Sequence, residues 1–213
     1  MATITLCADS PTTETLTLSR MKVNEFWVGQ RSTAQGPASS IPPFLLELIH
    51  QAVAFGVHRA SSSSSSPGTE LEFWGGPAEK AILPWTVVEL EKTKRSCVKI
   101  LGVEHLAGSE PYPSGVLIGR NIDDTVHVHW KGAAETILAM CSAYYDASGA
   151  VKVLDGGQRT KFRQMIQAMA AGSIGCIGFA HKQVPEQEYD DPDHNKLLNG
   201  NSLTLLGLVG IKG

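Results

Sequence analysis

The sequence has 213 residues and a formal net charge of −3, with 42% hydrophobic and 18% charged residues. A chain of this size can bury a substantial core, and this composition is typical of a globular protein rather than a disordered one. The small negative charge gives no electrostatic reason to expect a nucleic-acid partner or an anionic membrane surface. Composition and charge therefore argue against both of these function classes.

The four cysteines are scattered and none forms a CxxC pair, so we expect reduced thiols rather than disulfides or a structural zinc site. The first residues lack the basic start and apolar stretch of a signal peptide. The most apolar helical segment, which begins at Phe44, is too short for a membrane span and carries Glu47 and His50. The sequence thus predicts a soluble, cytoplasmic chain without membrane insertion.

The first half of the chain mixes strand and helix patterns. Alternating β-formers over Thr15–Val28 predict one or two strands, and apolar residues at helical spacing predict a helix over Phe44–Val57. The serine run Ser61–Ser66 indicates a surface loop. A further helix is expected from Pro77, where Glu79 suits the positive N-terminal end.

The second half predicts a sheet with two helices. Glycine- and proline-rich turns separate its first strands, which favours an antiparallel meander. Because strands and helices alternate without a strict βαβ rhythm, we expect an α+β fold with a mainly antiparallel twisted sheet flanked by helices. The expected strands are 97–106, 116–120, 123–130, 173–184 and 202–211, and the expected helices are Ala133–Tyr145 and Arg159–Ala171, the latter ended by Gly172.

Four segments carry more specific patterns: "TLTLSRMKVNEFWVG" from Thr15, "GGPAEKAILPW" from Gly75, "VHVHWKGAAETIL" from Val126 and "LTLLGLVGIKG" from Leu203. In this order they resemble segments of P-type ATPases, in the form found in plant calmodulin-regulated, plasma-membrane-type calcium pumps. The third resembles the Lys-Gly-Ala-x-Glu segment of that family. Together the four segments span nearly the whole chain, and their combination is far more specific than any one of them.

The resemblance implies a domain organisation. Residues 29–202 would form a cytosolic nucleotide-binding domain, residues 1–28 an N-terminal segment with a hinge strand, and residues 203–213 the returning hinge strand. The sequence shows no counterpart of the transmembrane helices, the actuator domain or most of the phosphorylation domain. A calcium path needs polar groups inside membrane helices. We therefore expect no autonomous transport.

The resemblance also implies a nucleotide pocket. Lys131 and Gly132 match the family's lysine and glycine that lie against the nucleotide, and Glu79 matches the glutamate that accepts a hydrogen bond from the adenine amino group. ATP is the implied ligand, with magnesium only as its companion. From the residues alone, a helix-end charge for Glu79 and a surface position for Lys131 are the simpler interpretations, and the resemblance favours the pocket.

Other pocket positions depart from the family pattern. Leu106 stands where the family carries a stacking aromatic, and Gly175 stands where it carries an arginine for the phosphates. Tyr112 would stack only if its loop were rearranged. A lost stacking ring costs about 1–3 kcal/mol, and each lost charge-assisted phosphate contact costs about 1.5–3 kcal/mol. We therefore expect weak or absent ATP binding.

The chain carries no catalytic candidate that fits the family's chemistry. Pro11 stands at the position of the phosphorylated aspartate, while Asp9 is displaced by two residues and lacks the following lysine. His127 and His129 share one strand face at a spacing that suits a metal, but two ligands fall short of a zinc site. We therefore assign no catalytic residue and no metal, and expect a chain that is inactive as an enzyme on its own.

Two functions of different classes remain open from the sequence. The first is a stand-alone nucleotide-binding domain with weak or lost ATP binding. The second is a non-catalytic interaction or regulatory protein that keeps the fold and binds a protein partner, such as an intact calcium pump. A truncated pump gene product without retained activity is a third alternative.

Overall fold

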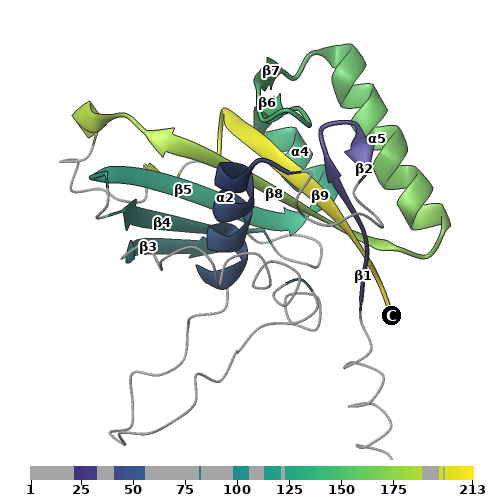
Figure 1. Ribbon diagram of the computed structural model, residues 1–213, viewed down its shortest axis with the longest axis horizontal. Coiled ribbons are helices and arrows are strands. Elements are labelled where there is room, and N and C mark those ends of the chain that lie inside the picture. Colours follow the sequence, from purple (N-terminus) through teal and green to yellow (C-terminus); the bar gives the residue numbers. More distant parts are fainter. Residues whose placement is uncertain are drawn as a thin grey trace, which may run out of the picture.

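The computed structural model describes residues 22–32, 41–55, 82, 98–105, 113–120, 123–188, 197–198 and 200–213. Within them the chain forms one nine-stranded sheet with helices on both faces (Figure 1). The strands are β1 (Lys22–Val28), β2 (Arg31–Ser32), β3 (Val98–His105), β4 (Ser114–Arg120), β5 (Thr125–Ala133), β6 (Cys141–Tyr145), β7 (Val151–Val153), β8 (Gly175–Val184) and β9 (Leu203–Lys212). The helices are α2 (Pro43–Phe55), α4 (Ala134–Met140), α5 (Gly156–Ala171) and the short 3-10 helix η2 (Glu186–Glu188).

The main path of the sheet runs β2-β1-β9-β8-β5-β4-β3, and β6 joins β9 at its side. All pairs along the main path are antiparallel, whereas β6 runs parallel to β9. The expected α+β fold with a mainly antiparallel sheet is confirmed, as is the meander formed by β3, β4 and β5. Strand β5 lies between β4 and β8, so both of its edges are hydrogen-bonded.

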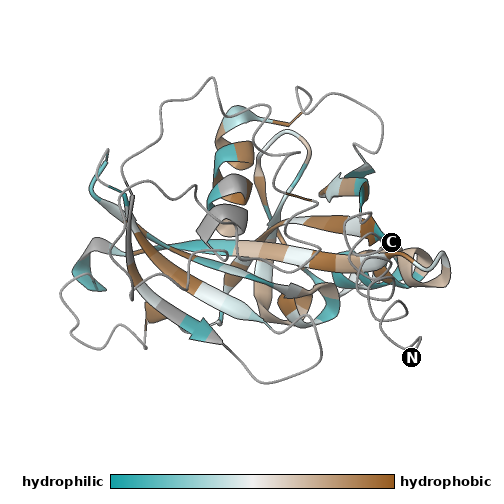
Figure 2. Cartoon of the chain, turned by 90° about the horizontal axis from the view of Figure 1, so that it is seen from below, coloured by the Kyte–Doolittle hydropathy of each residue, from teal (hydrophilic) through white to brown (hydrophobic). Residues whose placement is uncertain are grey.

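The helices divide the interior into two apolar layers. Helix α2 lies against β5, β8 and β9 on one face, while α4 and α5 pack on the other. Figure 2 shows hydrophobic residues concentrated along the strands and on part of α2. Because side chains alternate along a strand, Val128 and Trp130 enter the layer with α4 and α5, whereas His127, His129 and Lys131 face the side of α2.

Strand β5 continues directly into α4, as expected, but that helix is shorter than its sequence pattern. The prediction of a helix over Ala133–Tyr145 is wrong after Met140. Cys141 has extended backbone angles, φ −89° and ψ 141°, and the residues from Cys141 onward pair with β9 and β7. Serine and tyrosine have modest helix propensity, so two flanking strands outweigh the local apolar pattern.

Two further segments contain elements that are missing from the predicted strands and helices. The segment after Tyr145 contains strand β7 and the first turn of α5, which begins at Gly156 rather than at Arg159. Asp155 caps this helix, because its side chain accepts a hydrogen bond from the backbone N–H of Gln158 at 2.8 Å. The end of α5 before Gly172 is confirmed. The segment after Val28 likewise contains β2, which pairs with β1.

The segments expected to form a hinge lie side by side. Strands β1 and β9 pair from Lys22 opposite Lys212 to Trp27 opposite Leu208. Domain boundaries at residues 29 and 203 remain a prediction. The serine run and nearly all of the helix expected from Pro77 lie outside the described residues, although Ile82 is helical and fully buried. No helix in the described part of the chain is both long enough and apolar enough to span a bilayer.

Candidate functional site

Lys131 lies near the end of β5 between two neighbouring strands. Its Cα partners are Ser114 of β4 and Phe179 of β8, and only 8% of its surface is exposed. The adjacent Trp130 points to the opposite face, where its indole N–H donates to the carbonyl of Leu198 at 3.2 Å. A cation enclosed in this way is poorly hydrated, so it interacts more strongly with an anion than a surface lysine does.

Gly132 is held in a place that accepts no side chain. A Cβ atom there would lie 2.8 Å from Cα and 3.1 Å from N of Pro113. Gly178 stands opposite Gly132 on β8, and a Cβ on Gly178 would lie 2.9 Å from Cβ of Ile137. The two glycines thus let the backbone at Pro113 and helix α4 approach the sheet closely.

Phe179 is the aromatic residue beside Lys131 on the same face. It is 1% exposed and packs in the apolar layer under α2, so its ring is not available for stacking on a ligand. Asp9, Glu79, Leu106 and Tyr112 lie outside the described residues. Of the predicted nucleotide contacts, the structure therefore describes Lys131 and Gly132, which are consecutive residues of one strand.

Gly175 begins β8 on the same sheet face as Phe179, because the two are four residues apart in one strand. It is exposed, and a Cβ there would meet only the carbonyl oxygen of Ile211, at 3.7 Å. The position therefore accepts a Cβ without a clash. Residue 175 lacks a cationic side chain because it is a glycine, and not because neighbouring atoms exclude a Cβ there.

The histidines that share the face of Lys131 are buried and neutral. Burial lowers the pKa of His127 to about 4, with a further lowering by the Arg120 guanidinium. Burial also holds the pKa of His129 well below its usual range. His181 of β8 stands opposite His129, and burial lowers its pKa to about 3. No three His, Cys, Asp or Glu side chains in the described part of the chain are arranged to hold a metal ion.

Sequence reasoning missed His181 as a neighbour of the other two histidines. Its place depends on the register between β5 and β8, which are joined by more than forty residues of intervening chain. The one sequence signal for His181 is weak: the strand pattern "FAHKQV" contains a single histidine. The residues around His181 do not indicate which strand will pair with β8.

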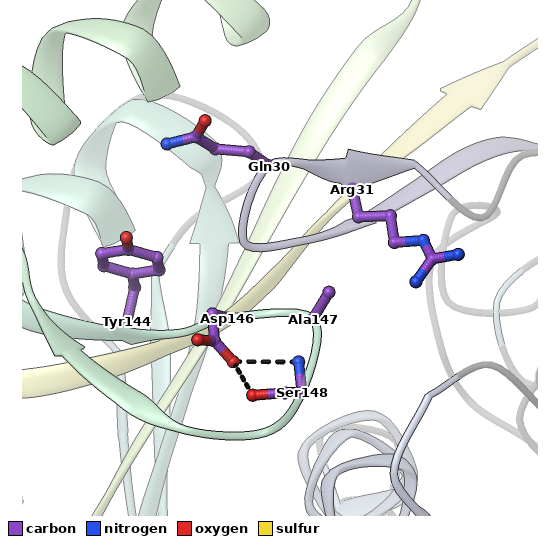
Figure 3. Close-up of a pocket in the computed structure, with 6 residues that line it drawn as sticks. All are labelled: Gln30, Arg31, Tyr144, Asp146, Ala147 and Ser148. Carbon is purple, nitrogen blue, oxygen red and sulfur yellow. Dashed lines mark hydrogen bonds between the residues drawn. The ribbon is translucent and has the colours of Figure 1, made fainter.

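A hollow of about 370 Å³ lies elsewhere, between the β1–β2 turn and the loop after β6 (Figure 3). Among its described lining residues the one carboxylate is that of Asp146. It accepts hydrogen bonds from the backbone N–H of Ser148 at 2.9 Å, the Ser148 hydroxyl at 2.6 Å and the N–H of Ala150 at 3.0 Å. The Ser148 hydroxyl bond is the main cause that lowers the pKa of Asp146. The Asp146 carboxylate therefore stabilises the turn that follows it. Neither Lys131 nor Gly132 lines the hollow.

The two described cysteines, Cys141 and Cys176, are free thiols. The Cys141 thiol donates to the carbonyl of Ile137 at 3.1 Å. Burial raises the pKa of each to about 12, so both are protonated at neutral pH. Because the thiolate is the reactive form, neither is suited to nucleophilic catalysis.

Comparison with known proteins shows which proteins this chain is similar to. Residues 115–213 match the family model described as P-type ATPase, cytoplasmic domain N. Over 97% of its length the chain is 41% identical to calcium-transporting ATPase 12, plasma membrane-type, of Arabidopsis thaliana and 39% identical to calcium-transporting ATPase 7, plasma membrane-type, of Oryza sativa subsp. japonica. Each match covers 19% of the relative, so the chain spans about a fifth of the length of these proteins. The chain is therefore similar to a part of plasma-membrane-type calcium-transporting ATPases, and its residues 115–213 match the cytoplasmic domain N of P-type ATPases.

Proposed function

We propose that this chain is a nucleotide-binding domain of the calcium-transporting P-type ATPase type that acts in the cytosol and binds ATP only weakly. The observation that carries the proposal is the Lys131–Gly132 corner. There a lysine with 8% exposure precedes a glycine whose Cβ would lie 2.8 Å from Pro113. A phosphate or adenine edge brought to this corner meets an enclosed cation beside a closely packed backbone.

The rest of the pocket argues for low affinity. The family's phosphate-side arginine is replaced by the exposed Gly175, and the Phe179 ring is buried in the core. A nucleotide held by one enclosed lysine and by Glu79 lacks two of the contacts that the family uses. Each 1.4 kcal/mol lost lowers affinity about tenfold, so we propose a dissociation constant of about 1 mM or weaker. Magnesium would enter only with the phosphates of ATP.

The test is a titration of the full chain with Mg·ATP, followed by NMR, with Lys131→Ala as the matched variant. We expect saturable shifts centred on Lys131 and Gly132 at millimolar ATP, and their loss in the variant. Micromolar affinity would contradict the proposed weakness. An absence of shifts at β5 up to tens of millimolar ATP would contradict the proposed site.

A second candidate function is that of a non-catalytic interaction protein. The exposed edge of strand β7 favours this function. Strand β7 pairs with β6 on one side and with no other described strand, and its Val151 and Val153 are 56% and 77% exposed. Open strand edges with apolar side chains accept a further strand from a partner. Capture of an intact calcium pump by the wild-type chain, abolished by Val153→Lys and unaffected by Lys131→Ala, would support this function. Loss of capture through Lys131→Ala alone would count against it.

A further inference from the structure

Three imidazoles gather on the sheet face that α2 covers. His127 and His129 come from β5 and His181 from β8, and we call them the imidazole cluster. Their ring centroids lie 6.2 Å apart for His127 and His129 and 5.7 Å apart for each of the two pairs that include His181. Their exposed fractions are 5%, 2% and 7%, so all three rings are enclosed by protein.

Most ring nitrogens of the cluster lack a hydrogen-bond partner among the described residues. Nε2 of His127 lies 2.9 Å from Oγ1 of Thr125, and Nε2 of His181 lies 3.3 Å from the hydroxyl of Tyr145. Nδ1 of His127, both ring nitrogens of His129 and Nδ1 of His181 are buried without a partner in the same part of the chain. Buried polar groups are usually hydrogen-bonded, so a cluster with several buried ring nitrogens that lack a partner among the described residues is uncommon.

Among the charged groups around the cluster, the Arg120 guanidinium disfavours a proton on His127 more than the Asp123 carboxylate favours one. Arg120 of β4 and Lys131 of β5 are cations on the same face, and the hydroxyl of Tyr145 stays protonated because burial raises its pKa. The acid from α2 is Glu47, whose Oε1 lies 3.5 Å from Nη2 of Arg120. Asp123 also contacts Arg120, at 3.5 Å. Both of these carboxylates are thus already engaged with a cation.

Helix α2 touches this region through polar as well as apolar side chains. Nε2 of Gln51 donates to Oε1 of Glu47 at 3.2 Å, while the buried Oε1 of Gln51 has no partner among the described residues. Phe44 packs edge-on against Tyr145 at 5.9 Å, and the Tyr145 ring lies 5.9 Å from His181. Release of α2 would therefore open the cluster to water from its covered side. By contrast, α5 packs in the opposite layer, and the three buried histidines of the described residues lie on the α2 side of the sheet.

We propose that the imidazole cluster is a proton-sensitive latch that keeps α2 on the sheet at neutral pH and releases it in acid. Opening lets up to three imidazoles take protons from the solvent, and closing returns those protons. In water a histidine titrates near pH 6.5, whereas burial lowers the pKa of His127 to about 4 and of His181 to about 3. The open form therefore binds more protons below about pH 6.5, which favours opening as the pH falls. The inference does not depend on nucleotide binding.

Hydrogen exchange of the full chain between pH 7 and pH 4.5, corrected for intrinsic exchange, tests the latch. Each imidazole exposed on opening raises the opening constant by up to about tenfold per pH unit below its open-state pKa. We expect α2 amides to lose protection steeply, by up to about a thousandfold per unit for three imidazoles, while α5 amides stay protected. Simultaneous loss in α2 and α5, or a flat α2 profile, would overturn the proposal.

Variants separate the cluster from general acid sensitivity. His129→Leu removes a buried ring that has no hydrogen-bond partner among the described residues. The slope for α2 should then fall by about tenfold per pH unit, since one proton fewer is taken up. His181→Gln keeps a polar group for Tyr145 and should lower the slope similarly. His194→Gln, which replaces a histidine other than these three, should leave the slope unchanged.

An undiminished slope in either folded cluster variant would overturn the latch. The wild-type comparison of α2 with α5 remains decisive if a variant does not fold.

Discussion

Gly132 and Pro113 approach so closely that a Cβ on Gly132 would lie 2.8 Å from Cα of Pro113. The atoms in the way belong to backbone and not to a flexible side chain, so they cannot move aside at little cost. The glycine after Lys131 is therefore a packing requirement as well as a candidate ligand contact. Its replacement tests the first of these roles separately from the second.

Gly132→Ala should destabilise the fold by about 1–3 kcal/mol, the usual cost of overpacking. Urea denaturation followed by circular dichroism measures the change. The matched control is Gly156→Ala, since a Cβ at Gly156 meets nothing within 4 Å in the first turn of α5. Alanine there should leave stability unchanged or raise it by up to about 1 kcal/mol. Equal stability of the wild type and Gly132→Ala would contradict the close contact.

Gly175→Arg should strengthen ATP binding, because it adds a cation on the Lys131 face at an exposed position that accepts a Cβ without a clash. A charge-assisted hydrogen bond contributes about 1.5–3 kcal/mol, which corresponds to roughly 10- to 150-fold in affinity. Calorimetry of Gly175→Arg against Gly175→Gln separates charge from size. An arginine variant no tighter than the glutamine variant would show that residue 175 does not reach the phosphates.

Asp155→Ala should lower the stability of the fold by about 0.5–2 kcal/mol, the typical value of an N-cap. The reason is that Asp155 accepts the hydrogen bond from the Gln158 N–H at the start of α5. Asp155→Asn keeps an acceptor and should recover most of the loss. Thermal unfolding of the two variants provides the comparison, and an equal loss in both would point to charge rather than capping.

Cys141 and Cys176 should resist alkylation in the folded chain at pH 8. A pKa of about 12 for each leaves only a minute thiolate fraction. Cys141 is also buried, and Cys176 is half-buried. A Cys7→Ser, Cys97→Ser variant isolates them, and mass spectrometry after iodoacetamide treatment monitors the reaction. Labelling should appear only with denaturant; rapid labelling of the native chain would refute the burial of these thiols.

Much of the fold can be predicted from the sequence, because many of its elements depend on residues that are close together in the chain. The end of α5 at Gly172, the strand before Lys131 and the meander of β3 to β5 all follow from residue patterns within a few positions. The residues after Met140 behave differently, since β6 exists only because β9 and β7 lie on either side of it. A helical pattern without knowledge of those partners therefore predicts a helix that is too long.

Some features of the candidate site can also be predicted from neighbouring residues, whereas others depend on strand pairing. Lys131 and Gly132 are adjacent in the sequence, and their motif could be recognised without a structure. The closeness of Gly132 to Pro113, the commitment of Phe179 to the core and the arrival of His181 beside His129 depend on strand register. Register is set by pairings between distant segments, so these features became visible only in the folded chain.

The most direct test of the proposed function is the affinity of the full chain for Mg·ATP, measured by NMR titration with Lys131→Ala in parallel. We predict saturable shifts at Lys131 and Gly132 with a dissociation constant of about 1 mM or weaker, and their disappearance in the variant. Micromolar binding, or shifts that persist unchanged in Lys131→Ala, would contradict a weakened pocket centred on Lys131.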